Sequence, residues 1–112
     1  MPNILKATNF KKFGTLKVGK VRDVYVQKDR IILVSTDRHS SFDRIIAHIP
    51  HKGQLLTQSS MFWFDKTKEI INNHVVSTDV SEFPGECRPY ASELRGRSML
   101  VKKTKPLGVE CI

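Results

Sequence analysis

The chain has 112 residues, of which 39% are hydrophobic, and its 19 Lys and Arg against 11 Asp and Glu give a formal net charge of +8. This length suits one small domain with a single hydrophobic core. No apolar run approaches the roughly 18 residues that a membrane span needs, and the first residues lack the apolar segment of a signal peptide. Two cysteines make neither a disulfide scaffold nor a metal cluster, so we expect a reduced, cytoplasmic protein with no membrane partner.

The positive charge is concentrated at the start of the chain. Residues 1–30 carry eight Lys or Arg and two Asp, whereas residues 31–80 are neutral and residues 81–112 have a net charge of +2. A basic first third indicates an anionic partner, which is either the phosphate of a nucleic acid or a phosphorylated small molecule. Charge alone leaves both alternatives open.

Three short β-type runs of apolar residues between residues 15 and 36, the third of them continuous and more buried, predict an antiparallel meander. The stretch before them, residues 1–14, is expected to be a lightly packed lead-in with Leu5, Phe10 and Phe13 as its anchors.

After the meander, residues 36–43 are dense in Ser and Asp, which disfavour regular structure, and we predict a polar loop there. Residues 45–49 predict a further short strand, which ends at Pro50.

A helical pattern follows Gly53 and is expected to end at Asn72. Its spacing places Leu56, Trp63 and Ile70 on one face, which we expect to be buried against the sheet. On this interpretation the helix contributes a large part of the core, and its tryptophan is structural.

The aromatic run 62–64 lies in the neutral part of the chain, where it is more typical of a core face than of a platform for stacking bases. Beyond the helix we predict strands at residues 75–76 and 99–101, with irregular structure at 84–97. Residues 109–112 begin another apolar run, which we expect to continue as a strand in a longer chain.

A glycine and two basic residues stand together at the junction of the first two predicted strands. Gly19 is followed by Lys20 and Arg22, which alternation directs to the same side of a strand. A glycine lets backbone amides approach a phosphate, and the two cations add compensating charge. The pattern alone favours a solvated basic hairpin over a phosphate-binding turn, and no P-loop or dinucleotide-binding glycine motif occurs in the chain.

The polar loop gathers two carboxylates, two hydroxyls and a guanidinium within seven positions. Such a group suits a polar substrate or a metal, and it suits helix caps and turn hydrogen bonds equally well. The residues concerned are Asp37, Arg38, Ser40, Ser41 and Asp43.

The remaining candidates have ordinary explanations when the pattern is considered alone. Lys102 and Lys103 end a basic strand on opposite faces, so only one of them can point into a site. The four histidines lack the spacing of metal ligands, and no base stands near a cysteine to activate its thiol. We therefore predict structural or exposed histidines and inert thiols at His39, His48, His51, His74, Cys87 and Cys111.

Taken together and in order, five segments resemble the phosphoribosylaminoimidazole-succinocarboxamide synthase (SAICAR synthetase) family. The resemblance covers residues 16–112 and corresponds to the N-terminal part of the family's enzyme. In the loop, His39 and Ser41 depart from the family's usual residues, as does His51 further on. The matching segments are 19–25, 35–43, 49–57, 62–64, and 99–103 with 106–110.

The resemblance implies a ligase of purine biosynthesis that uses ATP and Mg²⁺. ATP phosphorylates the carboxylate of carboxyaminoimidazole ribonucleotide, and the amine of L-aspartate attacks the acyl phosphate. No catalytic residue and no metal ligand is assigned within these residues. The implied ATP-binding residues are Gly19, Lys20, Val21, Arg22, Lys102, Thr104, Lys105, Pro106 and Leu107. The implied substrate-binding residues are Asp37, Arg38, Ser40, Ser41, Asp43, Lys52, Gly53 and Glu110.

The implied fold is α+β, an antiparallel β-sheet lobe with one main helix, like the N-terminal lobe of an ATP-grasp or kinase-like enzyme. Residues 15–112 would form this nucleotide-binding lobe, truncated at its C-terminal end. We expect the isolated piece to be inactive without the remainder of the enzyme chain, and to self-associate through its uncovered face. The alternative is a basic nucleic-acid-binding or interaction module, which the position of the aromatic residues on the neutral helix disfavours.

Overall fold

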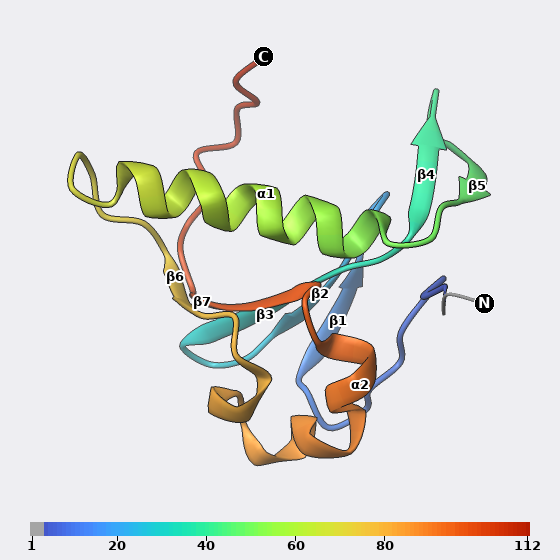
Figure 1. Ribbon diagram of the computed structural model, residues 1–112, viewed down its shortest axis with the longest axis horizontal. Helices are drawn as coiled ribbons and strands as arrows, with labels where there is room; N and C mark the ends of the chain where they lie inside the picture. Colours follow the sequence, from blue (N-terminus) through green and yellow to red (C-terminus); the bar gives the residue numbers. More distant parts are fainter. Residues whose placement is uncertain (1–3) are drawn as a thin grey trace.

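The computed structural model describes residues 4–112, and an antiparallel sheet forms its centre. The sheet has five strands in the order β1-β2-β3-β7-β6. Its first three strands are consecutive in the chain, which confirms the predicted meander. Helix α1 lies over one face of the sheet, and short helical segments lie on the other side (Figure 1). The strands are β1 (Thr15–Val18), β2 (Arg22–Val26), β3 (Arg30–Ser35), β6 (Val75–Ser77) and β7 (Ser98–Lys102).

A second, two-stranded sheet projects beside the N-terminal end of α1 (Figure 1). It pairs β4 (Arg38–Ser41) with β5 (Arg44–His48). The prediction of a loop was wrong for β4, because pairing with β5 satisfies its backbone although its side chains are polar. Only Phe42 and Asp43 form the turn, with φ values of 50° and 64°. Positive φ at both central residues is the geometry that suits a tight hairpin.

The hydrophobic core lies on the face of the sheet opposite α1. Strand register places Tyr25 beside Ile32 and Ile32 beside Leu100, so alternate residues of β2, β3 and β7 point to this face. The described part of the lead-in, residues 4–14, is anchored in the core as predicted for Phe10 and Phe13, whose rings lie 5.7 and 5.3 Å from the ring of Tyr25, and is not lightly packed. Residues 1–3 of the predicted lead-in lie outside the described residues. The other buried members of this cluster are Val34, Val80, Phe83, Cys87 and Leu94.

Short helical turns close this side of the core. They are η1 (Val80–Glu82), η2 (Gly85–Tyr90) and α2 (Ala91–Leu94). Within them Cys87 is fully buried, and burial raises the pKa of its thiol to about 11. A protonated, inaccessible thiol agrees with the prediction that Cys87 is inert.

Helix α1 (Lys52–Thr67) packs through a different face from the one predicted. Its buried residues are Gly53 and Thr57, whereas Trp63 is 64% exposed. The helix ends at Thr67 and not at the predicted Asn72, so Ile70, which is 81% exposed, lies beyond it. Small side chains let the helix backbone approach the sheet closely, and this approach, rather than the apolar stripe, decides which face turns inward. The prediction of a buried Trp63 was therefore wrong.

We expect Trp63→Ala to lower the free energy of unfolding by less than about 1 kcal/mol, because most of the side chain is already in water. Phe13, at 1% exposed, provides the matched comparison, and Phe13→Ala should cost about 3–5 kcal/mol as a core truncation. Urea denaturation of both variants measures the difference. Equal losses in the two variants would contradict the packing described for α1.

The chain after β7 leaves the sheet in an extended path. Residues 103–112 form no helix or strand and are exposed, so the strand predicted at 109–112 is not present here. Residues 4–112 contain one antiparallel main sheet, one long helix and a small hairpin, which confirms the α+β class.

Candidate functional site

The tips of two hairpins meet through an ion pair. Lys20, in the turn between β1 and β2, pairs with Asp43 in the turn between β4 and β5, and their side chains are 70% and 78% exposed. The hydrogen bond between them lowers the pKa of Asp43 and raises the pKa of Lys20, which the charge of Glu110 raises further. Two residues that the sequence assigned to the site, from two separate segments, therefore meet at the hairpin tips.

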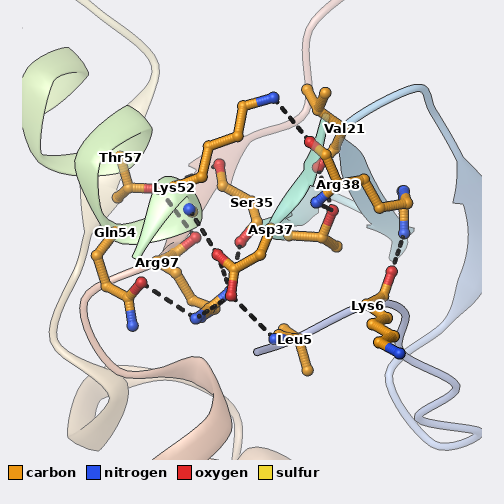
Figure 2. Close-up of polar contacts among 12 residues, drawn as sticks. Leu5, Lys6, Val21, Ser35, Asp37, Arg38, Lys52, Gln54, Thr57 and Arg97 are labelled. Atoms are coloured by element: carbon orange, nitrogen blue, oxygen red, sulfur yellow. Dashed lines mark hydrogen bonds and ion pairs between the residues drawn. The ribbon is translucent and has the colours of Figure 1, made fainter. Parts of the chain in front are cut away.

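Arg38 lies beneath these tips and is 7% exposed. Its Nη2 donates to the carbonyl oxygen of Gly19 at 3.0 Å, and its Nε donates to that of Lys20 at 3.2 Å. The same Nη2 pairs with Oδ1 of Asp23 at 2.8 Å. Nη1 donates to the carbonyl oxygen of Lys6 at 2.9 Å (Figure 2). Protein acceptors thus occupy each nitrogen of the guanidinium.

Asp37 is the centre of a second buried cluster (Figure 2). The amides of Leu5 and Gly53 donate to its carboxylate at 2.9 and 2.8 Å. Two nitrogens of Arg97 donate to the same carboxylate at 3.1 and 3.2 Å, and one of them also reaches Gln54. Burial raises the pKa of Asp37, but the bonds from Gly53, Arg97 and Leu5 outweigh it and leave the pKa below its usual value.

This cluster holds together the lead-in, the start of α1 and the residue before β7. Sequence reasoning missed Arg97, which lies in the stretch predicted to be irregular. It is separated from Asp37 by 60 positions, and no local pattern links two residues so far apart. The one feature of the sequence that could have indicated this role is the position of Arg97 directly before the buried strand β7.

Lys52, the first residue of α1, lies at the edge of the site. Its Nζ donates to the carbonyl oxygen of Arg38 at 2.7 Å and lies 3.2 Å from Nδ1 of His39. Ser40 and Ser41 are half-buried on β4. These residues retain accessible surface from which they can meet a ligand.

Three of the residues predicted to bind substrate are instead beneath the surface. Asp37, Arg38 and Gly53 are buried, and their polar groups are engaged by other parts of the chain. Their polar groups hold neighbouring segments of the chain together, and direct substrate contact by any of them stays a prediction.

Arg22 follows the hairpin tip but occupies different surroundings from Lys20. Its side chain, together with Phe64 and His74, borders a cavity of about 190 Å³ between the sheet and α1. The rings of Phe64 and His74 meet edge to face, with centroids 5.5 Å apart. His74 was not assigned to the site from the sequence, because nothing in its spacing distinguished it from an ordinary exposed histidine.

The residues predicted to contact adenine lie at the other end of the main sheet. Lys102 pairs in register with Arg30, whereas Arg22 pairs with Ser35, at the opposite end of β3. Thr104, Lys105, Pro106 and Leu107 follow in the exposed segment. The structure therefore separates the predicted phosphate and adenine residues along the strands.

Two further observations bear on the kind of site. Within residues 4–112, no three side chains of His, Cys, Asp or Glu gather closely enough to hold a metal ion. In the same part of the chain, no helix has the length and hydropathy to cross a membrane.

Comparison with known sequences gives one consistent result. The family model for SAICAR synthetase matches residues 15–112. Phosphoribosylaminoimidazole-succinocarboxamide synthase of Desulfosudis oleivorans is 52% identical over 113 aligned residues, which cover 100% of this chain and 39% of the relative. The Thermodesulfovibrio yellowstonii protein of the same name shows the same identity and the same coverage. The chain thus spans about two fifths of the length of these relatives.

Solved structures agree with the sequence comparison. A SAICAR synthase from Saccharomyces cerevisiae, described as complexed with SAICAR, superposes with a TM-score of 0.79 at 36% identity, over 90% of this chain and 37% of that one. A type-2 SAICAR synthetase described as a complex with ADP gives a TM-score of 0.58 at 23% identity, over 80% of this chain and 33% of that one, and supports the fold alone. From the matched residues, the identity and the shared fold, the chain belongs to the SAICAR synthetase family.

Proposed function

We propose that this chain forms the N-terminal nucleotide-binding lobe of an ATP-dependent ligase that makes the succinocarboxamide SAICAR. The observation that carries the proposal is the meeting of Lys20 and Asp43 at the tips of the β1–β2 and β4–β5 hairpins, in a chain of this family. In the proposed reaction the γ-phosphoryl group of ATP passes to the carboxylate of carboxyaminoimidazole ribonucleotide. The amine of L-aspartate then displaces phosphate from the acyl carbon, which gives the amide, ADP and phosphate.

Residues 19–22 are proposed to bind the phosphates of ATP. Backbone amides of the turn and the ammonium of Lys20 supply donors, and Arg22 supplies a second cation on the α1 face of the sheet. The adenine side is proposed at Lys102, Thr104, Lys105, Pro106 and Leu107. The strand partners of Arg22 and Lys102, Ser35 and Arg30, are five steps apart on β3. Five steps span roughly 17 Å, which is the length scale of an extended nucleoside triphosphate.

The substrate side is proposed at the β4–β5 hairpin and the start of α1. Ser40, Ser41 and Asp43 present hydroxyls and a carboxylate, and Lys52 presents an ammonium at the same edge. We assign Asp37, Arg38 and Gly53 to this region as residues that hold its backbone in place. Because every reactant is anionic, the excess of positive charge in the first 30 residues favours the binding of the reactants to this lobe.

Mg²⁺ enters the proposal as the counter-ion of the nucleotide. Mg²⁺ in nucleotide sites takes one or two carboxylates and completes its coordination with phosphate oxygens and water. The carboxylate of Glu110, which is exposed in the segment after β7, is proposed as such a single protein contact. Bound there, the ion would neutralise charge on the transferring phosphoryl group.

Lys20→Ala tests the phosphate assignment in a chain that has the full length of the relatives. Loss of one charge-assisted hydrogen bond, about 1.5–3 kcal/mol, should raise the dissociation constant for ATP by about 10-fold to 150-fold. Isothermal titration calorimetry measures it. Lys28→Ala, at an exposed lysine in the β2–β3 turn, is the control and should leave the constant unchanged; an equal rise in both variants would show only a general effect of charge.

A SAICAR synthesis assay with ATP, L-aspartate and the carboxylated ribonucleotide tests the reaction itself. The full-length chain should form SAICAR, and the 112 residues alone should not. Absence of product from the full-length chain would overturn the proposed function. The nucleic-acid-binding alternative is not favoured, because the sequence and structure comparisons lead to the ligase family.

A further inference from the structure

The β1–β2 turn presents two successive carbonyl groups to one buried side chain. The oxygens of Gly19 and Lys20 accept from Nη2 and Nε of Arg38, at 3.0 and 3.2 Å. Arg38 therefore holds the carbonyl side of this turn by donating hydrogen bonds to it.

The orientation of these carbonyls fixes the orientation of the next amides. No peptide bond in the described part of the chain is cis, and in a trans peptide the C=O of one residue and the N–H of the next point in opposite directions. The amides of Lys20 and Val21 consequently point away from Arg38. Neither donates to an acceptor within residues 4–112. Successive amides turned outward in a tight turn form a concave anion-binding group.

Arg38 is itself held rigidly enough to impose this orientation. Its guanidinium pairs with Asp23, whose side chain is 1% exposed. Oδ2 of Asp23 accepts from the amide and the hydroxyl of Thr8, both at 2.8 Å, and Arg38 also reaches the carbonyl oxygen of Lys6. The lead-in, β2 and β4 thus together fix the guanidinium, and the guanidinium fixes the turn.

We propose that Arg38 is a positioning residue that turns the amides of Lys20 and Val21 outward so that they bind phosphate, without touching the ligand itself. This inference rests on the proposed function of residues 19–22. It explains through the contacts of Arg38 why the amides of this turn are available to phosphate. It also accounts for why Arg38, which the sequence placed in a substrate loop, is buried.

Arg97 offers a matched control for the test. It is a second buried arginine in an ion pair with an aspartate, Asp37, and its side chain is 3% exposed. Its contacts are to Ser35, Asp37 and Gln54, none of which belongs to the turn. Arg38→Lys and Arg97→Lys therefore both disturb a buried ion pair, but only the first withdraws the fork that holds the two turn carbonyls.

The experiment records amide resonances by ¹⁵N NMR while inorganic tripolyphosphate is added to the chain and to each variant. In the unmodified chain the Lys20 and Val21 amides should shift on addition of tripolyphosphate. Arg38→Lys should raise the dissociation constant at these amides by about tenfold, the effect of roughly one lost hydrogen bond. It should also lower the ¹⁵N order parameters of residues 19–21, whereas Arg97→Lys should change neither quantity.

The outcomes separate the inference from the function on which it rests. Unshifted Lys20 and Val21 amides in the unmodified chain would overturn phosphate binding at the turn, and with it this role of Arg38. If these amides shift but Arg38→Lys and Arg97→Lys raise the dissociation constant for tripolyphosphate equally, only the positioning role of Arg38 would be overturned. If Arg38→Lys does not fold, the double variant Asp23→Asn with Arg38→Gln replaces it, because it leaves no unpaired buried charge. This variant should show the same rise in the dissociation constant and the same fall in the order parameters of residues 19–21. Unchanged values of both quantities would refute the inference.

Discussion

Replacement of Gly53 by alanine is expected to destabilise the chain more than any other single methyl addition to the main helix. A Cβ at this position would lie 2.2 Å from the carbonyl oxygen of Ser35 and 2.7 Å from Nη1 of Arg97. The nearest atom belongs to the backbone of β3, so a side-chain movement cannot relieve the overlap. We expect a loss of about 3 kcal/mol or more in the free energy of unfolding, together with displacement of α1 from the sheet.

Gly85→Ala is the matched control for this change. A Cβ at Gly85, in η2, would meet no atom within 4 Å, and its addition should change stability by less than about 0.5 kcal/mol. Urea denaturation of the two variants, followed by circular dichroism, gives the comparison. A Gly53→Ala variant as stable as Gly85→Ala would show that α1 does not approach β3 as closely as described.

Asp37→Asn is expected to be nearly as damaging, although the two side chains have the same shape. The asparagine nitrogen cannot accept hydrogen bonds, and the guanidinium of Arg97 would remain charged and buried without its partner. Breaking a buried ion pair in this way costs about 3–5 kcal/mol. Asp65→Asn, which removes one partner of an exposed ion pair with Lys68, should cost at most about 1 kcal/mol.

The same carboxylate makes stability depend on pH in a defined direction. Because the pKa of Asp37 in the folded chain is lower than its usual 3.8, the folded state favours the ionised form. Its contribution is fully present above about pH 4 and is lost as the pH falls through the lowered pKa. The stability gap between the unmodified chain and Asp37→Asn should therefore narrow below about pH 4, as measured by urea denaturation from pH 7 to pH 3. A gap of constant size would contradict the assignment of the charge to Asp37.

Prediction from the sequence succeeded where short-range alternation determines the structure. Short apolar runs in residues 15–36, separated by polar turn residues, predicted the three strands of the meander. Prediction failed for β4, because strand pairing depends on the partner strand and not on the polarity of the strand's own residues. It also failed for the packing face of α1, because the close approach at Gly53 outweighs the apolar stripe that contains Trp63.

The candidate site was predictable in part for the same reason. Lys20 and Arg22 stand out by their spacing after a glycine, and Asp43 stands out in a polar segment. The supporting contacts were not predictable, since Arg97 lies 60 positions from Asp37 and Arg38 lies 19 positions from Gly19. Spacing along the chain reveals groups that share one strand or one turn, whereas buried ion pairs between distant segments emerge only from the fold.

The outward position of Trp63 has a spectroscopic consequence. It is the single tryptophan of the chain, and 64% of it is exposed, so its fluorescence should be emitted at long wavelength and should be readily quenched by acrylamide. Phe62, beside it on α1, is also exposed. Any polypeptide that covers this side of the helix would shift the emission to shorter wavelength and reduce the quenching. The chain thus carries an intrinsic optical reporter at an exposed position of α1, which reports on whatever covers this helix.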